Sequence, residues 1–547
     1  MNMTSPPESK LSVVQARNGS RTATAGSIRI HSSVNPEHEA ELFLNARMPL
    51  LEGSAAVILG SSLGYLTREI RRRFPAIRII TLDYTHEFSR FLVAAPDHEW
   101  HPQSGESVGA FLHRVLPEEE LAGLAIIEWQ PAARAFPARA RQVAAEFTDA
   151  LSELNANIAT TGYFGRRWVR NAFANFLCLN EFQPLPPSRG VTVIAASGPS
   201  LERSAQSLVR HRDAIGIWAL GSAVAPLLAR GIVPDLVVLT DPGYYGIEHL
   251  HCLLGRSVPV MLPLTSARGV WRTKCPVVLI DQGSTVEDAL LPRLGLRSIH
   301  AAANGTVAGT ALDVALKTTG GPIVFAGFDL ALHDLQSHAS PHAFDRYIRY
   351  RQQRRTPETT LLFERNILDS APISGTRYRS TRAHVTFRNW FASWEGMVTR
   401  SVYRLSASPV SLPMQPVDEE GFRLLIEATT RSGPPVHGDA PSGSYSTGTS
   451  PLVRAAVLEE IVDRWHRELS EFAHRIDSVS QPWDSRSAGQ NSVPGILRLV
   501  DLPGLLRIRR LLSRSRSKAA HEAGQVVHSV TQFLASTLAN ATRSFNS

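Results

Sequence analysis

Residues 197–200 form the best candidate for a phosphate-binding turn in this chain. The segment reads Ser197, Gly198, Pro199 and Ser200, and it follows the short apolar run 192–196. Apolar residues with helical spacing come next, so a strand is expected to lead through this turn into a helix. Backbone N–H groups at such a helix start can hold a phosphate. The alternative is that the turn only begins the helix, with serine as the N-cap residue.

Small and acidic residues follow the next two apolar runs. Gly221 and Ser222 end the second run, and Asp241 ends the third. Ligands of open parallel sheets bind outside the carboxyl ends of the strands, so these residues would share an edge with the turn. Gly221 and Ser222 would let a ligand approach the backbone, or only allow a strand and a helix to pack closely. Asp241 could bind a ribose or an acceptor, or hold magnesium through water. Asp235 begins the third run, at the opposite edge, and is expected to be structural.

Two later segments add polar groups at the same edge. Asn304, Gly305 and Thr306 open an expected helix, where they could donate to a base or a phosphate, or form an ordinary N-cap. Asp329 leaves the buried run 321–328, and an unpaired carboxylate is costly to bury. Asp329 should therefore have either a partner in the chain or a ligand.

His338 is the candidate general base. An imidazole has a pKa near neutral pH and can take a proton from an acceptor hydroxyl. His333 and His342 flank it, but their irregular spacing gives poor support for a metal site, and no metal is expected. Arginines gather in residues 346–355, where they could attract an acidic sugar or a phosphate, or lie on a solvated helix face.

The elements that would position these residues alternate between strand and helix. Residues 192–242 fit a strand–helix–strand–helix–strand unit, and Thr306–Lys317 fits a later helix. The further runs that fit strands are residues 258–264, 275–281, 299–305 and 321–332. This alternation predicts a parallel sheet covered by helices.

Residues 55–83 fit the opening of a second nucleotide fold. A strand leads into a turn with Gly60 and Gly64, then a basic amphipathic helix, then a strand that ends in Asp83. That carboxylate stands at the distance expected of a ribose-binding residue. The glycine pattern is degenerate, however, and the alternative is a Rossmann-like domain that binds nothing.

Composition restricts the class of protein. The chain has 547 residues, 43% of them hydrophobic, and a net charge of +8, which fits several domains and an anionic partner. No run reaches the ~20 apolar residues of a membrane span, and the N-terminus lacks the apolar core of a secretory signal, so a cytoplasmic location is expected. Three scattered cysteines predict neither a disulfide framework nor a zinc site. No nucleic-acid-binding module is recognised.

Segments rich in proline, glycine and serine divide the chain. Residues 1–50 are expected to be weakly structured and loop-like, and Leu452–Ile476 has the apolar spacing of an amphipathic helix. The expected domains are an N-terminal segment (1–50), a Rossmann-like domain (51–183), a central domain (190–415), a linker (416–451) and a helical, basic C-terminal region (452–547).

Several segments, taken in order, resemble the motility-associated factor (Maf) family of flagellin glycosyltransferases over most of residues 55–415. The matching motifs are LGSSLGY, GRRWVRNAFANF, ASGPSLER, GIVPDLVVLTDP, NGTVAGTALDVAL and VFAGFDLAL followed by SHASPH. The central domain of that family is similar to bacterial sialyltransferases, which use CMP-activated acidic sugars. It is also similar to MptE-like 6-hydroxymethylpterin pyrophosphokinases, which share the GPSL turn. The chain departs from these patterns at Ala196 and Ser197, where sialyltransferases carry Gly-Asn, and at Phe328, where family members have a polar residue.

The resemblance implies an α/β fold with a Rossmann-like N-terminal domain, a central parallel-sheet, sialyltransferase-like (GT-A-like) domain and a helical C-terminal region. The expected function is transfer of a nonulosonic acid of sialic, pseudaminic or legionaminic type from a CMP-sugar to Ser or Thr of flagellin, with inversion. His338 would be the base, and Asp241 and Asp329 would frame the reaction centre, with no cofactor. The expected nucleotide-binding residues are Ser197, Gly198, Pro199, Ser200, Gly221, Ser222, Asn304, Gly305 and Thr306. The alternatives are a magnesium-dependent, MptE-like pyrophosphokinase and an inactive scaffold of the same fold.

Overall fold

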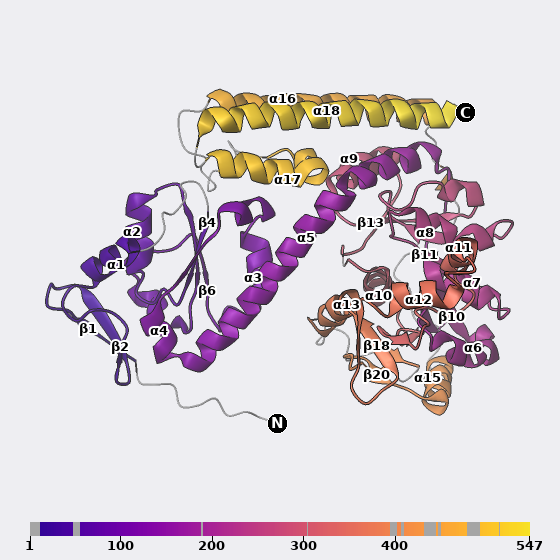
Figure 1. Cartoon of the computed structure of the whole chain (residues 1–547), viewed down its shortest axis with the longest axis horizontal. Helices are drawn as coiled ribbons and strands as arrows, with labels where there is room; N and C mark the ends of the chain where they lie inside the picture. Colours follow the sequence, from indigo (N-terminus) through magenta and orange to yellow (C-terminus); the bar gives the residue numbers. More distant parts are fainter. Residues whose placement is uncertain are drawn as a thin grey trace. The chain divides into compact units, whose positions relative to one another are not determined.

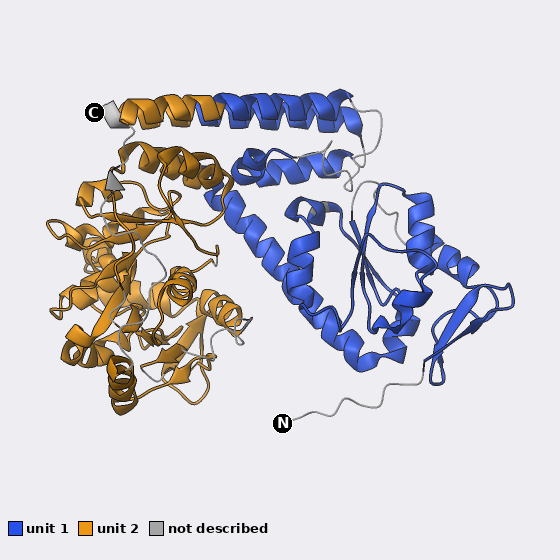
Figure 2. Cartoon of the chain, turned by 180° about the vertical axis from the view of Figure 1, so that it is seen from behind, with its two compact units in different colours: residues 1–166, 463–535 blue, residues 167–462, 536–547 orange. Residues whose placement is uncertain are grey.

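The computed structural model describes residues 11–46, 55–187, 190–303, 305–393, 402–405, 408, 410–431, 445–446, 450–478, 493–512 and 515–546. These residues divide into two compact units. Unit 1 comprises those within 1–166 and 463–535, and unit 2 those within 167–462 and 536–547. Figure 2 shows that α5 (Pro137–Cys178), α16 (Pro451–Ser478) and α18 (Arg516–Asn546) each contribute residues to both units.

This division differs from the boundary near residue 183 that the sequence suggests. Helix α5 is continuous across residues 166 and 167, so no chain break or loop marks the border between the units. Strand β8 (Glu181–Phe182) pairs with β13 (Val277–Asp281) and therefore belongs to the sheet of unit 2. The proline-rich segment 184–190 thus follows β8, a strand of unit 2, and does not separate two domains.

The sheet of unit 1 has the parallel strand order β6-β5-β4-β7. Its strands are β4 (Ala55–Leu59), β5 (Arg78–Leu82), β6 (His98–Trp100) and β7 (Ala125–Glu128). Helix α2 (Tyr65–Arg73) lies on one side of the sheet, and α3 (Val108–Val115) and α5 lie on the other (Figure 1). Strand β4 is apolar and fully buried, as a strand covered on both faces must be. The Rossmann-like opening predicted over 55–83 is therefore confirmed.

The described part of residues 1–50 is ordered, so the expectation of a loop-like segment is wrong. Strands β1 (Leu11–Gln15), β2 (Arg21–Ala25) and β3 (Ile28–Arg29) form an antiparallel sheet, and α1 (Pro36–Asn45) follows. Small buried residues of β2 and the buried Ile30 join the core of unit 1. Strands of two to five residues are too short for apolar periodicity to reveal them.

The remaining elements of unit 1 connect these layers. They are η1 (His86–Phe91), η2 (Glu118–Gly123), α4 (Gln130–Ala135) and α17 (Gly495–Leu512). Helix α17 packs on η2, where Arg498 lies 2.6 Å from Glu119 and Arg509 lies 3.8 Å from Glu120. Part of the basic C-terminal region is thus neutralised within its own unit.

The main sheet of unit 2 has the strand order β20-β19-β15-β9-β10-β11-β12-β13-β8-β21, with β14 beside β13. The further strands are β9 (Val191–Ala195), β10 (Ile215–Leu220), β11 (Leu236–Val238), β12 (Val260–Leu262), β14 (Ile299–His300), β15 (Ile323–Ala326), β19 (Val402–Arg404), β20 (Gln415–Pro416) and β21 (Tyr445–Ser446). Strands β15 and β9 to β13 are all parallel. The predicted parallel sheet is confirmed.

The order of these strands reverses direction at β9. The chain proceeds from β9 through β10, β11 and β12 to β13, and α10 (Val307–Thr318) then returns it to β15 on the other side of β9. Helix α10 packs across β9, β10 and β15. The carboxyl ends of β9 and β15 therefore form a topological switch point, where parallel sheets of this class bind ligands.

Helices cover this sheet, and α6 and α7 follow β9 and β10 as predicted (Figure 1). The helical elements of unit 2 are α6 (Leu201–Arg210), η3 (Arg212–Ala214), η4 (Gly221–Ala223), α7 (Val224–Leu228), α8 (Tyr244–Glu248), η5 (His251–Leu253), η6 (Val270–Thr273), α9 (Thr285–Leu294), α11 (Ala343–Arg351), α12 (Glu358–Asn366), α13 (Arg382–Ser393) and α15 (Glu419–Arg431). Strands β16 (Leu332–His333), β17 (Ser370–Pro372) and β18 (Tyr378–Thr381) form a small antiparallel sheet. Within the described ranges, no helix is both long and apolar enough to cross a membrane.

Part of the expected linker is an ordered helix. Helix α15 buries Phe422 and Ile426 and packs against β9, so the segment after residue 416 contributes to unit 2. Residues 432–444 and 447–449 lie outside the described residues. The amphipathic helix predicted over Leu452–Ile476 is confirmed by α16, which buries Trp465 and Leu469 among others.

Candidate functional site

The turn after β9 and the turn after β15 touch each other at the switch point. The Gly198 N–H donates to the Gly327 carbonyl over 2.7 Å. A Cβ atom on Gly198 would lie 2.5 Å from that oxygen, and one on Gly327, whose φ is +68°, would lie 2.4 Å from the Ala196 carbonyl. Both positions therefore require glycine so that the backbones can approach. The two turns form one rigid structure at the carboxyl edge of the sheet.

The buried carboxylate of Asp329 holds the turn of residues 197–200 in place through hydrogen bonds to Ser200. Its side chain is 2% exposed, and its Oδ2 accepts the Ser200 N–H over 2.7 Å. The Ser200 hydroxyl donates to Oδ1 of the same carboxylate. Burial raises the pKa of Asp329, while these hydrogen bonds and the nearby Arg203 lower it. The expected partner of Asp329 is therefore Ser200, and in this structure neither donor of Ser200 is open to a phosphate.

Ser197 and Ser222 join the ends of β9 and β10. Their hydroxyl oxygens lie 2.7 Å apart. Gly221 lies beside them, and a Cβ atom on Gly221 would be 3.7 Å from the His249 Cβ. The Ala339 N–H donates to the Ser197 carbonyl over 2.7 Å. That bond attaches the loop of His338 to the turn, so the predicted base and the predicted nucleotide turn share one edge.

Three histidines and an aromatic ring pack together in this region. The rings of His338 and His342 stack with 4.2 Å between centroids, and His249 meets His342 edge-on at 5.0 Å. The Phe344 ring lies 4.9 Å from the His342 ring, and the Arg365 guanidinium lies over the Phe344 ring, with 3.9 Å from Cζ to the ring centroid. In the residues that the structure describes, no group of three or more His, Cys, Asp or Glu side chains could hold a metal ion.

Burial keeps these imidazoles neutral. It lowers the pKa of His338 to about 4 and that of His342 to about 2, and it also lowers the pKa of His249. His342 Nδ1 accepts the Phe344 N–H as the N-cap of α11, so its proton resides on Nε2. Within the described residues Nε2 of His342 has no hydrogen-bond partner. A neutral His338 has a free lone pair at neutral pH, as a general base requires.

These pKa values predict that the folded chain loses stability as the pH falls from about 6.5 to about 4. In that interval the unfolded chain binds a proton at His338 (ordinary pKa 6.5), whereas the folded chain does not. Each such histidine lowers the free energy of unfolding by up to ~1.4 kcal/mol per pH unit. Urea denaturation of the wild type and of His338→Gln across this interval measures the effect. Equal slopes for the two proteins would contradict the assignment.

Asp241 lies on the same edge, three residues beyond Val238, where β11 ends. Its Oδ1 accepts the Gly243 N–H over 2.6 Å, and its carbonyl accepts the Ala267 N–H. Oδ2 has no hydrogen-bond partner among the described residues. Its negative charge acts on His249, whose pKa it raises against the effect of burial. Asp235, in contrast, accepts the Ile217 N–H and pairs with Arg212 at the opposite edge, which confirms its predicted structural role.

Two buried asparagines of α5 hold the loops after β11 and β12. Asn171 Nδ2 donates to the carbonyls of Pro242 and Thr265, at 3.0 and 3.2 Å. Asn175 Nδ2 donates to those of Leu264 and Ser266, at 2.9 and 3.1 Å. The two residues are four positions apart and so share one helix face. They position the Asp241 loop, and sequence reasoning missed this role although the motif GRRWVRNAFANF contains both.

We expect Asn175→Ala to lower the free energy of unfolding by about 3 kcal/mol, because it leaves two buried carbonyls without donors. Denaturation followed by far-UV circular dichroism measures this loss. Asn155→Ala on the exposed part of the same helix is the control, since its amide bonds only its own helix. A loss no larger than that of the control would contradict the bridging role.

The third predicted nucleotide segment is partly described. Asn304 lies outside the described residues. Thr306 is the N-cap of α10, and its hydroxyl accepts the Gly309 N–H over 2.8 Å, which is the ordinary capping alternative. Gly305 has φ +64° and open space around a built Cβ. These residues follow β14, beyond β13, instead of β9 or β10.

The glycine turn of unit 1 is occupied by its own chain. The Ser62 N–H donates to Asp83 over 2.9 Å, and burial raises the pKa of Asp83 to about 7. A Cβ on Gly60 would meet the Tyr84 ring at 2.5 Å, and one on Gly64 would meet a backbone oxygen at 2.8 Å. The glycines therefore allow close packing within the unit. These contacts favour the structural alternative for the Rossmann-like domain.

Comparisons with known proteins support the resemblance given above. Residues 167–334 match the family model described as 6-hydroxymethylpterin diphosphokinase MptE-like. Two uncharacterized proteins of Treponema pallidum (strain Nichols) are similar: one is 28% identical over 61% of this chain and 73% of its own length, and one is 30% identical over 21% and 56%. The solved structure of a Maf glycosyltransferase from Magnetospirillum magneticum AMB-1 superposes with a TM-score of 0.63, covering 98% of this chain and 93% of that one at 13% identity. The expected α/β fold, with its helical C-terminal region, is confirmed.

Proposed function

We propose that this chain transfers a nonulosonic acid from a CMP donor to a Ser or Thr hydroxyl of flagellin. The observation that carries the proposal is the bond from the Ala339 N–H to the Ser197 carbonyl, because it places the His338 loop on the turn at the switch point. A base and a nucleotide turn on one edge are what a displacement at an activated sugar needs. The shared fold with a solved Maf glycosyltransferase supports sugar transfer.

In this reaction the acceptor oxygen forms a bond to the anomeric carbon, and the bond from that carbon to the phosphate oxygen breaks. CMP leaves with the electron pair. Nε2 of His338 takes the hydroxyl proton, in the tautomer whose Nδ1–H donates to the Ser337 hydroxyl oxygen over 3.0 Å. Ser197 and Ser222 offer hydroxyls to the nucleotide, and Asp241 orients the acceptor. Asp329 is a positioning residue that holds the turn through Ser200.

Calorimetric titration with CMP tests the donor half of the proposal. We expect saturable binding that is independent of magnesium and is weakened at least tenfold by Ser197→Ala. Ser204→Ala is the matched control, because its hydroxyl bonds the Ser200 carbonyl on the helix side of the turn. Equal affinities of the two variants, or no CMP binding by the wild type, would contradict the proposed nucleotide site.

The match to the MptE-like family model favours a second candidate, a pyrophosphokinase that transfers diphosphate from ATP to a pterin. That reaction requires magnesium, for which Oδ2 of Asp241 is an available oxygen ligand. The same titration with ATP and magnesium distinguishes the two. Magnesium-dependent ATP binding without CMP binding would replace the first proposal with this one, and silence toward every nucleotide would favour an inactive scaffold.

A further inference from the structure

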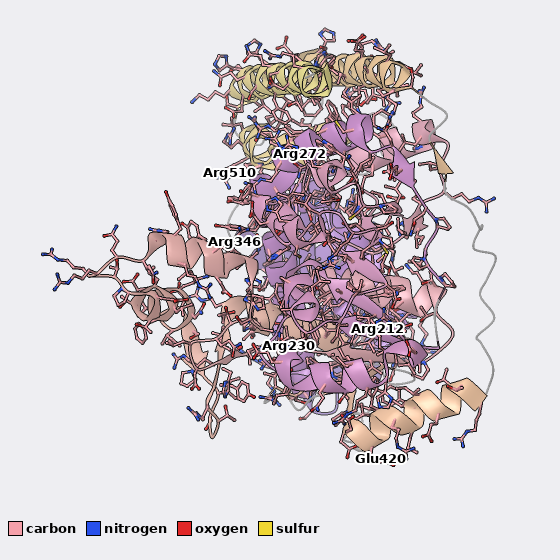
Figure 3. The ribbon with its side chains drawn as sticks, turned by 90° about the vertical axis from the view of Figure 1, so that its right-hand side faces the viewer. Arg212, Arg230, Arg272, Arg346, Glu420 and Arg510 are labelled. Atoms are coloured by element: carbon pink, nitrogen blue, oxygen red, sulfur yellow. The ribbon has the colours of Figure 1, made fainter. Side chains whose placement is uncertain are left out.

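Residues 346–357 form a basic surface, here called the arginine arm. The segment contains five arginines and two tyrosines and no Asp or Glu: Arg346, Arg349, Arg351, Arg354, Arg355, Tyr347 and Tyr350. It begins in α11 and ends where α12 starts. Figure 3 labels Arg346 on a helix that projects from the body of unit 2. The sequence alone left open whether these arginines face the donor or solvent, and the structure exposes all five.

The arm presents these side chains on an ordered backbone. Ile348 is buried and anchors α11, and Arg351 donates to the Tyr347 hydroxyl over 2.9 Å while stacking on its ring. Beyond the helix, Gln353 and Thr356 exchange two backbone hydrogen bonds of 3.0 Å each. Arg354 and Arg355 therefore form the tip of a closed turn. An ordered array loses less conformational entropy on binding than a flexible one.

The arm lacks its own counter-charges. In the described part of the chain none of its five arginines forms an ion pair, whereas Arg210 pairs with Glu419 and Arg230 with Glu202 elsewhere in unit 2. Like charges placed this close repel one another, and an acidic partner would relieve that repulsion. Tyr350 adds an aromatic ring that is 90% exposed. Arginine and tyrosine, with tryptophan, are enriched among the residues that carry most of the binding energy at protein–protein interfaces.

We infer that the arginine arm docks an acidic surface of the acceptor protein beside the candidate site. The inference rests on the proposed function for the identity of that acceptor. His342 connects the two places, because it is the N-cap of α11 and also stacks on His338. Arg351 lies about 13 Å along the helix from His342 at the ~1.5 Å rise of each residue. A folded acceptor can span that distance while one of its hydroxyls reaches the site. The arm lacks the apolar face of Leu, Phe or Trp that membrane-surface helices carry.

The test compares two double variants in a binding assay with purified flagellin from the organism that encodes the chain. Arg354→Glu/Arg355→Glu reverses the charge at the tip of the arm and leaves the backbone hydrogen bonds between Gln353 and Thr356 in place. Arg297→Glu/Arg431→Glu makes the same charge change at two exposed arginines of unit 2 that form no ion pair in the described residues. We expect the first variant to weaken flagellin binding at least tenfold, and more at low salt, with CMP affinity unchanged. The control should bind flagellin as the wild type does.

Other results would overturn the inference. Equal losses in both variants would indicate only general attraction to positive charge. Loss of binding to anionic phospholipid vesicles or to an oligonucleotide, with flagellin binding intact, would assign the arm to a different partner. A wild type that binds CMP but not flagellin would contradict this docking role while leaving the donor half of the proposed function standing. Flagellin binding through the arm without CMP binding would support the docking role and contradict the donor half of the proposed function.

Discussion

Asp329→Ala is expected to raise the dissociation constant for CMP at least tenfold and to lower the free energy of unfolding by about 3 kcal/mol. The carboxylate is buried and holds both the N–H and the hydroxyl of Ser200, so its removal leaves two buried donors unsatisfied. The same carboxylate would lie 2.7 Å from a Cβ on Gly198, which shows how closely it packs under the turn. Without it, the helix start is free to move and no longer presents a fixed set of donors.

Ser200→Ala provides the graded control for this prediction. It removes the hydroxyl but keeps the 2.7 Å bond from the Ser200 N–H to Asp329, so we expect a loss of about 1 kcal/mol and a small change in CMP affinity. Calorimetry with CMP and urea denaturation of the same samples measure both quantities. If Asp329→Ala were destabilised but bound CMP like the wild type, the turn would be an element of the fold and not a nucleotide site.

The sheet of unit 2 could be predicted because its strands are continuous apolar runs ending in glycine or polar residues. Strands such as β9 and β10 are buried along their whole length and almost entirely apolar, as strands covered on both faces of a parallel sheet are. The carboxyl edge followed from the same pattern, since all these strands are parallel. The pattern predicts one edge for Ser197, Gly221, Ser222 and Asp241, and in the structure all four follow the carboxyl ends of β9, β10 and β11.

The contacts that decide the roles of these residues could not be predicted. Ser200 and Asp329 are 129 positions apart, and from the sequence either could face a ligand. Their contact depends on the pairing of β15 with β9, which local sequence patterns do not reveal. His249 follows a short helix with no motif around it, and only the packing of α8 and α11 brings it to His342. The boundary between the units could not be predicted, because helix α5 continues through residue 166 and no proline, glycine-rich segment or loop marks the boundary there. Each of these contacts depends on which elements pack together in the folded chain, and the spacing of residues along the sequence does not show that.

The roles of Asp241 and His338 are separable by kinetics, because a base takes the acceptor proton whereas a positioning group only orients the acceptor. We expect His338→Gln to lower kcat for sugar transfer by about 10²–10⁴-fold, the usual contribution of a general base, with CMP affinity unchanged. Burial holds the pKa of His338 near 4, so wild-type kcat/KM should be level above about pH 5 and decline below it. In His338→Gln the acid decline should disappear along with most of the rate.

Two controls make this result specific to His338. His251→Ala removes an exposed histidine whose ion-pair partner among the described residues is Glu248, and it should leave kcat unchanged. Asp241→Asn keeps the Gly243 bond but removes the charge, so a positioning role predicts a raised KM for the acceptor and a preserved acid decline. If Asp241→Asn abolished that decline and His338→Gln retained it, the carboxylate would be the base. His338 would then serve to keep the turn and α11 together, through the Ala339–Ser197 bond and its stacking on His342.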